Sequence, residues 1–368
     1  MRIADVEVIP YALPLAEPYV TAPGTLERRE MVLLRVRTDE GVVGLGEAVP
    51  LSLRGGETLS RVERALRRVA KRVARLDLAA MADAEPLPAA VDAVIHVSAG
   101  RRLPAPAKAA VEMAIFDLAG RISGMPLWQM LRGETAAPLR CNATLAAGSP
   151  RELATEAGRW RERGFETFKL KLGFGDDVER VRALRDAVGS DVRMRVDANG
   201  AWSTDRALAV LDEIAPLEIE LAEQPTATLR EMAAVAAATS IPIAADESVR
   251  SATEARRAVE SDACRLATVK LAKVGGIGPA GAIGAELPVY LSSSLDGPVG
   301  IAAAAHAAQA LYRGREDPGV AHGLATQELF ADTIAPVQCQ VRAGLLHLPE
   351  GPGLGVEIDE PALERHLL

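Results

Sequence analysis

Residues 167–200 read TFKLKLGFGDDVERVRALRDAVGSDVRMRVDANG, and the fold class follows from the pattern of these residues. It starts with a short apolar run, continues with a charged segment whose apolar residues recur every three or four positions, and ends with a second apolar run. Such a pattern predicts a strand, a helix and another strand. A helical crossover joins parallel strands of one sheet, so this unit indicates a parallel α/β architecture.

The same unit recurs through the second half of the chain. Short apolar runs follow one another about every 25 residues, at 141–145, 167–172, 192–196, 219–222, 241–245, 267–271 and 288–291. Helix-like segments such as TDRALAVLDEI and TLREMAAVAAAT lie between most of them. Seven or eight strand–helix units in about 190 residues predict a closed α/β barrel more than an open sheet. A short, atypical eighth strand is expected near residues 320–323.

The flanking parts of the sequence do not show this strand–helix alternation. Helical spacing covers 60–131, and strands are predicted at 3–11, 31–37 and 41–47. The polar segment from Glu17 to Arg29 contains two prolines and predicts a long loop. We therefore expect three parts: an N-terminal α+β unit over residues 1–132, the barrel over 138–335, and a C-terminal segment over 336–368 that packs back onto the first unit.

Composition narrows the classes of function. Lys+Arg 42 against Asp+Glu 50 gives a net charge of −8, which leaves no basic field for nucleic acid or an anionic membrane surface. Cys141, Cys264 and Cys339 are far apart and form no CxxC, which indicates a reduced protein without a thiolate metal site. The five histidines are scattered, and the N-terminus does not resemble a signal peptide. We expect a cytoplasmic enzyme with a small-molecule substrate and with no nucleic-acid or membrane partner.

The lysines are few and unevenly placed. Only six of the 42 basic residues are lysines, and four of these form the pairs Lys169/Lys171 and Lys270/Lys273. Arginine cannot lose its proton in a protein, whereas a buried lysine can act as a base. The pairs therefore hint at acid–base chemistry, with chance clustering of surface lysines as the alternative.

Carboxylates end three consecutive predicted strands. Asp197, Glu223 and Asp246 are separated by 26 and 23 residues and each follows an apolar run. Because neighbouring strands lie about 4.8 Å apart, we expect the three side chains to converge at the carboxyl end of the barrel. An oxygen-only set suits a hard divalent cation such as Mg²⁺. The alternative is that each acid only caps the helix that follows.

The two lysine pairs flank this predicted metal site. Strand alternation places Lys169 and Lys171 on one face, and Lys270 lies three strands beyond Asp197, across the barrel mouth. One amine can remove the proton next to a metal-bound carboxylate, while the other returns a proton or stabilises the enolate. A neighbouring cation lowers a lysine's pKa, as a base at neutral pH requires. Lys273, one turn later, is expected to be a surface or salt-bridging residue.

Five motifs carry a family resemblance: TFKLKLG, RVDANGAW, LAEQP, ADES and VKLAKVGG. In this order they resemble the enolase superfamily, in its muconate-lactonizing-enzyme subgroup. The resemblance implies a (β/α)7β TIM-like barrel with a capping domain built from the N-terminal segment and the C-terminal tail. It also implies that Asp197, Glu223 and Asp246 bind Mg²⁺, or Mn²⁺, and that Lys171 and Lys270 are the acid/base pair. Lys169 is then expected to support Lys171, and Asn199 to lie just outside the metal ligands.

The choice of reaction rests on smaller signals. The seventh predicted strand ends in SSSLD without the histidine of the mandelate racemase branch, and the paired lysines exclude enolase proper. Residues 321–324 read AHGL and lack the Asp-x-Asp that dipeptide epimerases share on the eighth strand. NAT at 142–144, SSSLDGPVGIA and GLATQELFADTI resemble o-succinylbenzoate synthases.

We therefore expect a lyase or isomerase that removes a proton α to a carboxylate through an enediolate. Dehydration of the o-succinylbenzoate synthase type is favoured, with muconate cycloisomerase and N-acylamino acid racemase or epimerase as alternatives. By this resemblance the substrate-binding residues are Asn142, Ser293, Ser294 and Asp296. The segments 17–29 and 51–56 are expected to set substrate choice, and the family commonly forms homo-oligomers.

Two readings from other classes compete with this one. Gly276, Gly278 and Gly281 form a GxGxxG after a predicted strand, with Asp296 downstream, as in NAD-dependent oxidoreductases. This unit is the sixth of its kind in the chain, and the strand before it carries Lys270, which counts against a dinucleotide site. A non-catalytic binding protein of the same fold would lack a ligand or a base, and none is missing.

Overall fold

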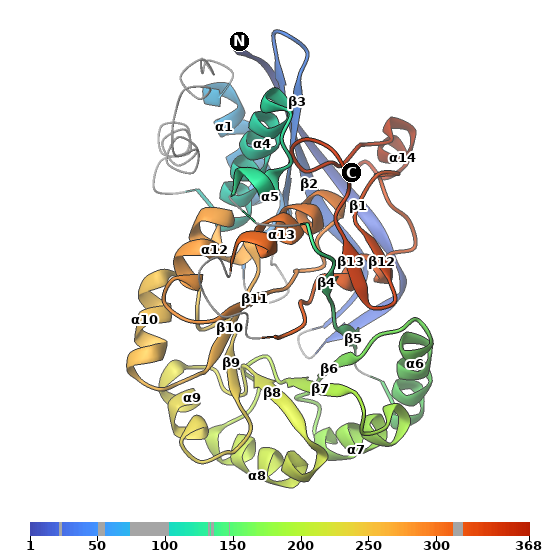
Figure 1. The fold of residues 1–368 in the computed structure, drawn as a ribbon, viewed down its shortest axis with the longest axis vertical. Helices are drawn as coiled ribbons and strands as arrows, with labels where there is room; N and C mark the ends of the chain where they lie inside the picture. The colour runs from blue at the N-terminus through green and yellow to red at the C-terminus, as the bar shows by residue number, and fades with distance from the viewer. Residues whose placement is uncertain are drawn as a thin grey trace.

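The computed structural model describes residues 1–21, 24–50, 56–73, 103–131, 133, 136–146, 148–311 and 319–368. A curled parallel sheet forms the lower part of the molecule in Figure 1, and an antiparallel sheet with two helices covers its upper end. A small sheet from the C-terminal part lies beside the antiparallel one. No helix in these described ranges is long and apolar enough to cross a membrane.

Seven parallel strands form the barrel in the order β11-β10-β9-β8-β7-β6-β5. Their bounds are β5 Ala143–Leu145, β6 Thr167–Lys171, β7 Arg193–Asp197, β8 Ile219–Glu223, β9 Ile243–Ala245, β10 Leu266–Val269 and β11 Val289–Leu291. Single bridges from His322 to Cys141 and from Gly323 to Ser292 join the two edges of this sheet. The predicted barrel is confirmed, and the expected eighth strand consists of these two bridges.

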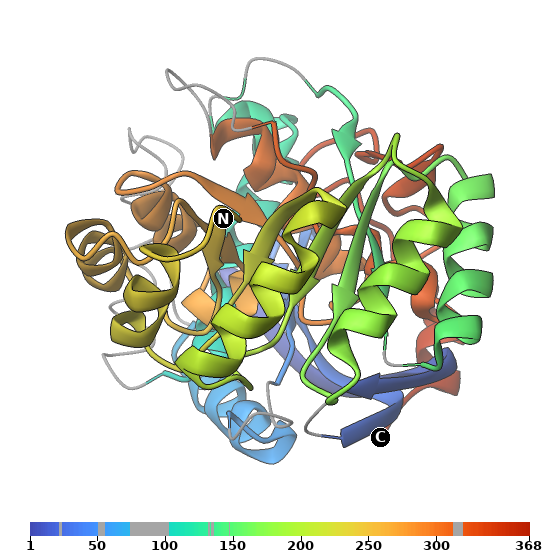
Figure 2. The ribbon, with the colours of Figure 1, turned by 90° about the horizontal axis from the view of Figure 1, so that it is seen from below.

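Helices cover the outer face of the strands, as the view from below shows (Figure 2). Several begin at a residue whose side chain accepts a backbone N–H, and Ser149 and Thr228 form complete capping boxes. Their bounds are α6 Pro150–Glu162, α7 Asp177–Val188, α8 Thr204–Ile214, η2 Ala215–Leu217, α9 Leu229–Ala236, α10 Ala252–Glu260, α11 Leu271–Val274, α12 Ile277–Gly284 and α13 Pro298–Leu311.

The cap contains the antiparallel strands β1 (Ile3–Thr21), β2 (Gly24–Thr38) and β3 (Val43–Ala48). Its helices are α1 Leu59–Val73, α4 Ala105–Ser123 and α5 Leu127–Met130. Helix α4 lies directly on β3, because glycines there have no side chain to hold it away. A Cβ on Gly46 would be 1.9 Å from the carbonyl oxygen of Ala110, so only glycine permits this contact.

The prediction of a long loop from Glu17 to Arg29 is wrong. Strands β1 and β2 continue through it as a hairpin, with Tyr19 paired to Leu26 and Thr21 to Gly24. The pairing register shifts between Pro14 and Tyr19. A bulge of this kind takes residues out of the ladder, so Pro18, which has no N–H to donate, does not end the strand.

The C-terminal segment contacts the cap. Strands β12 (Gln340–Arg342) and β13 (Leu345–His347) pair with β4 (Leu139–Arg140), with η3 (Ala325–Leu329) before them and α14 (Glu360–Arg365) after them. Leu367 forms a bridge with Tyr11, and the Arg35 guanidinium lies 2.7 Å from Glu360 Oε1. The tail packs against the N-terminal sheet, while the expected domain bounds stay a prediction.

Candidate active site

Strand register brings the expected site residues together. In the β6–β7–β8 part of the barrel, Lys171 lies opposite Asp197, and Asp197 lies opposite Glu223. Each of the three ends its strand, so their side chains meet at the carboxyl end of the barrel. Both carboxylates are fully buried.

Lysine ammonium groups neutralise these two carboxylates. Lys169 Nζ lies 2.6 Å from Glu223 Oε2 and 2.9 Å from Asp197 Oδ2. Lys171 Nζ donates to Asp197 and, at 3.1 Å, to Asn199 Oδ1, while the position of Asn199 just outside the metal ligands stays a prediction. Burial alone would lower the pKa of Lys169, but Asp197, Glu223 and Asp246 outweigh burial and raise it. Lys169 therefore holds a fixed positive charge beside Lys171.

Asp246 binds the second lysine pair. Lys270 Nζ donates to Asp246 Oδ2, and Lys273 Nζ lies 2.7 Å from Asp246 Oδ1 and 2.9 Å from the Thr268 carbonyl oxygen. Burial opposes ionisation of Asp246, yet Lys270 and Lys273 hold its pKa well below the ordinary value. The Lys273 side chain is only 7% exposed, so this residue is a buried salt-bridging residue of the site rather than a surface one.

Each of the three carboxylates is paired with lysine ammonium groups, and together they do not form a ready-made metal cage. Within the described part of the chain, no three His, Cys, Asp or Glu side chains gather closely enough to form one. Asp197, Glu223 and Asp246 still fit a hard cation, because all are fully buried oxygen donors. Glu223 Oε1 in particular is buried without a hydrogen-bond partner among the described residues. Such an oxygen is costly unless a cation meets it.

Sequence reasoning missed two residues that hydrogen-bond to the expected metal ligands. Gln224 Oε1 accepts the backbone N–H of Asp246 at 2.8 Å and so ties the end of β8 to the end of β9. Its position after Glu223 in LAEQP was an available signal. Tyr290 donates its hydroxyl proton to Glu223 Oε2 from β11. Nothing in an apolar strand sequence distinguishes this tyrosine from a core residue.

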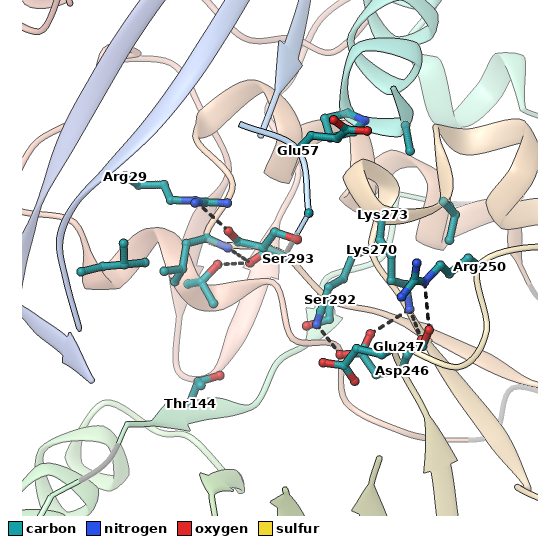
Figure 3. Close-up of a pocket in the computed structure, with 18 of the residues that line it drawn as sticks. Arg29, Glu57, Thr144, Asp246, Glu247, Arg250, Lys270, Lys273, Ser292 and Ser293 are labelled. Atoms are coloured by element: carbon teal, nitrogen blue, oxygen red, sulfur yellow. Dashed lines mark hydrogen bonds and ion pairs between the residues drawn. The ribbon is translucent and has the colours of Figure 1, made fainter. Parts of the chain in front are cut away.

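A cavity of about 680 Å³ lies where the barrel mouth meets the cap. Thr144 lies on one side of it and Asp246, Lys270 and Lys273 on the other (Figure 3). Lys169 and Lys171 line it from β6, and Tyr19, Leu26 and Gly56 from the cap. The hairpin β1–β2 thus reaches the barrel mouth, as expected for a segment that sets substrate choice. Of the other expected specificity segment, 51–56, residues 51–55 lie outside the described residues.

The four expected substrate-binding residues divide into two groups. Ser293 and Ser294 line the cavity, and direct contact with substrate stays a prediction for them. Asn142 and Asp296 do not line it. They hydrogen-bond to residues that do: Asn142 Nδ2 to Thr144 Oγ1 at 3.1 Å, and Asp296 Oδ1 to the backbone N–H of Ser294 at 3.0 Å. The structure places these two behind the cavity wall.

Glu47 and Arg29 of the cap anchor the serine loop, residues 292–297. Glu47 Oε1 accepts the backbone N–H of Gly297 at 2.7 Å, and Glu47 Oε2 accepts the Tyr11 hydroxyl at 2.9 Å. Arg29 Nε donates to the Ser294 carbonyl oxygen at 3.0 Å. Burial, with Asp296 nearby, raises the pKa of Glu47 from 4.5 to about 7. Burial likewise raises the pKa of Asp296 from 3.8 to about 6.

We predict that Glu47→Gln reduces the pH dependence of stability. A carboxyl whose pKa is raised in the folded state takes up a proton on folding, so stability falls as pH rises from about 4.5 to about 7. For Glu47 this loss is roughly 3 kcal/mol as an upper bound. Urea unfolding at several pH values should show a shallower slope for Glu47→Gln, and an unchanged slope for the exposed control Glu350→Gln. A wild-type slope in Glu47→Gln would contradict the prediction.

In the GxGxxG segment, a glutamate side chain of the cap binds the backbone N–H groups. Glu112 of α4 accepts the backbone N–H groups of Ile277 and, at 2.9 Å, of Gly278 at the start of α12. These are the groups that would cradle a pyrophosphate. A buried carboxylate there would repel one, so the structure counts against a dinucleotide site.

Comparison with known proteins gives the family. Residues 152–362 match the family described as Enolase C-terminal domain-like, and residues 3–132 match the Mandelate racemase / muconate lactonizing enzyme, N-terminal domain. The chain belongs to the enolase superfamily. The mandelate racemase/muconate lactonizing enzyme group expected from the five motifs is confirmed, and so is the expectation of an isomerase or lyase.

Relatives within this superfamily catalyse different reactions. The chain is 35% identical over 318 residues to an L-Ala-D/L-Glu epimerase of Bacillus subtilis (strain 168), covering 83% of this chain and 84% of the relative. It is 31% identical over 371 residues to an o-succinylbenzoate synthase of Geobacillus stearothermophilus, covering 96% and 93%. A dipeptide epimerase of Enterococcus faecalis V583, solved with Mg and L-Leu-L-Tyr, superposes with a TM-score of 0.88 at 29% identity, covering 97% and 100%.

Proposed function

We propose that the chain removes the proton α to a substrate carboxylate and eliminates water, as o-succinylbenzoate synthases do. Proton abstraction of the enolase superfamily type is supported by the family match and by the relatives. The observation that carries the finer assignment is the charge of the cavity wall, which suits a substrate with two carboxylates. An N-acylamino acid racemase is the second candidate, because an N-succinyl substrate also carries two carboxylates.

Mg²⁺ belongs to this proposal as the cofactor, and Mn²⁺ is expected to replace it. Asp197, Glu223 and Asp246 would hold the ion, since they are the buried carboxylates at the three strand ends. Once bound, a divalent cation lowers the barrier by neutralising the negative charge that develops on the substrate carboxylate. A dipeptide epimerase solved with Mg among the structural neighbours supports this choice of metal.

Lys171 and Lys270 are assigned the proton chemistry. Both line the cavity, from β6 and from the end of β10. In this proposal the Lys171 amine takes the α-proton, and the Lys270 ammonium stabilises the enediolate that forms. The Lys171 ammonium then gives this proton to the leaving hydroxyl, which departs as water as the new double bond forms. Lys169 lies beside Lys171 with its charge fixed by Asp197 and Glu223, so it orients the site without exchanging a proton.

The cavity wall favours anionic substrates over dipeptides. Besides the four lysines, Arg29, Arg61 and Arg250 line it, and these cations outnumber the lining carboxylates of Glu57, Asp246 and Glu247. Arg61 is paired with Glu57 at 2.9 Å. The Arg250 Nε donates to the Glu247 carbonyl oxygen at 3.0 Å, and none of the described carboxylates forms an ion pair with Arg250. On the eighth strand, residues 321–324 supply no carboxylate for a substrate ammonium group. The cavity thus offers a site for a second carboxylate and lacks the anion that a dipeptide amine needs on that strand.

A substrate panel tests this assignment. The panel contains the succinyl-substituted hydroxycyclohexadiene carboxylate, N-succinylamino acids, dipeptides and muconate, each with Mg²⁺. We expect the highest kcat/KM for dehydration of the cyclohexadiene carboxylate, followed by racemisation of N-succinylamino acids. Dipeptide epimerisation at a higher kcat/KM than either would contradict the proposal.

We predict that Arg250→Met raises KM for the preferred dicarboxylate by about 10- to 100-fold, with a smaller change in kcat. Loss of one charge-assisted hydrogen bond to a carboxylate has an effect of this size. Steady-state kinetics measure it, with the exposed Arg257→Met on α10 as the control that keeps wild-type KM. An unchanged KM in Arg250→Met would place the second carboxylate elsewhere.

A further inference from the structure

The two oxygens of Glu223 have different surroundings. Oε2 accepts from Lys169 Nζ at 2.6 Å and from the Tyr290 hydroxyl. Oε1 is buried, and no described residue donates to it. Both donors therefore contact Oε2. Oε1 remains available to a bound ligand such as a cation.

Tyr290 is itself held from two directions. It is fully buried on β11, where it lies in register with Thr268 on β10. Thr268 Oγ1 donates to the Tyr290 hydroxyl at 2.6 Å, so the phenol uses its acceptor for Thr268 and its proton for Glu223. The guanidinium carbon of Arg195 lies 5.1 Å from the centre of the ring. A cation over the ring face and a hydroxyl at its end fix the position of the phenol.

The hydrogen bond from Tyr290 to Glu223 joins two strands that are not neighbours in the sheet. Strand β11 is separated from β8 by β10 and β9, so the Tyr290 side chain crosses the barrel interior to meet Glu223. A phenylalanine would fill the same space and pack equally well against Leu221 and Ala244. Only the hydroxyl distinguishes the two, and its hydrogen bond goes to a residue assigned as a metal ligand.

We propose that Tyr290 is a positioning residue for the divalent cation: its hydroxyl holds Glu223 Oε2 so that Oε1 is presented to the metal. This proposal rests on the proposed function, which assigns Glu223 to the metal. Hydrogen bonds to the outer oxygen of a ligating carboxylate fix its rotamer, and their loss typically lowers metal affinity by about 10- to 100-fold. Lys169 supplies a charge at Oε2, whereas Tyr290 supplies direction without adding charge.

The test compares Tyr290 with Tyr11, a buried tyrosine whose glutamate partner is not assigned to the metal. Tyr290 and Tyr11 are both fully buried, and each donates its hydroxyl to a glutamate, Glu223 or Glu47. Mg²⁺ is titrated by calorimetry into EDTA-treated, dialysed wild-type protein, Tyr290→Phe and Tyr11→Phe, and each Tm is recorded. We expect Tyr290→Phe to raise the Kd for Mg²⁺ by about 10- to 100-fold, and Tyr11→Phe to change it by less than about twofold.

The outcomes separate this proposal from the function it rests on. A wild-type Kd in Tyr290→Phe, or an equal loss of affinity in both variants, overturns the positioning role. A lowered Tm with unchanged Kd likewise shows that Tyr290 only packs. A wild-type protein that binds no Mg²⁺ overturns the assignment of the metal ligands, and with it the proposed function.

A second variant keeps the test open if Tyr290→Phe does not fold. Thr268→Val removes the hydroxyl that donates to Tyr290 and leaves the ring over Arg195 in place. Its backbone carbonyl still accepts from Lys273. We expect it to raise the Kd for Mg²⁺ in the same direction by about threefold or more, and an unchanged Kd contradicts the proposal.

Discussion

Replacing Lys171 or Lys270 with alanine is expected to lower kcat by at least about 10³-fold. A positioned acid or base contributes about 10²- to 10⁴-fold, and each lysine here also provides charge next to the developing enediolate. In the proposed mechanism Lys171 takes the α-proton and Lys270 stabilises the enediolate that forms, so both variants should also lose α-proton exchange with deuterated water. Both quantities are measured on the preferred dicarboxylate with saturating Mg²⁺.

Lys71→Ala is the matched control for these variants. Lys71 is an exposed lysine on α1 and does not line the cavity. It should keep wild-type kcat, which shows that loss of a lysine charge alone is without effect. If Lys171→Ala still exchanges the α-proton at the wild-type rate, Lys171 is not the base. Circular dichroism of each variant verifies that the fold is retained.

Chelation by EDTA is expected to reduce activity to background, again by at least about 10³-fold. The substrate carboxylate gains negative charge as its α-proton leaves, and without the cation only the lysines oppose that charge. The protein itself should stay folded, because Lys169, Lys171, Lys270 and Lys273 already neutralise the three buried carboxylates. Activity and the thermal unfolding curve are measured on the same EDTA-treated sample.

Adding metals back distinguishes the kind of site. Mg²⁺ or Mn²⁺ should restore activity, because an oxygen-only set of carboxylates suits hard cations. Restoration by Zn²⁺ alone would contradict the assignment of Asp197, Glu223 and Asp246 to a hard cation.

Much of the site could be predicted because parallel strands impose a common edge. Once residues 167–200 indicated a strand–helix–strand unit, polar residues at the strand ends had to lie together. Lys171, Asp197 and Glu223 accordingly lie opposite one another on three adjacent strands. This inference needed only the spacing of apolar runs and the identity of the residues that end them.

Other contacts depend on tertiary geometry that spacing does not carry. Lys273 turns back to Asp246 because α11 begins directly after Lys270, and sequence cannot give the direction of so short a helix. Tyr290 reads as a core residue of β11 until its hydroxyl is seen on Glu223. Asp296 was expected at the substrate, but its contact with the Ser294 backbone places it behind the loop.

The prediction for the β1–β2 hairpin of the cap was wrong for a local reason. Prolines between Glu17 and Arg29 predict a loop, whereas the register shift after Pro14 lets β1 run on to Thr21. Loop signals therefore marked the bulge in a strand rather than the end of one.

In the proposed function, this cavity removes a proton α to a carboxylate in a metal-dependent step. The most direct measurement is ¹H NMR in deuterated water of the cyclohexadiene carboxylate and an N-succinylamino acid, each with enzyme and Mg²⁺ and again with EDTA. We expect the α-proton signal of each substrate to disappear with Mg²⁺ and to persist with EDTA. Persistence of both α-proton signals with Mg²⁺, or equally fast loss in EDTA, would contradict the claim.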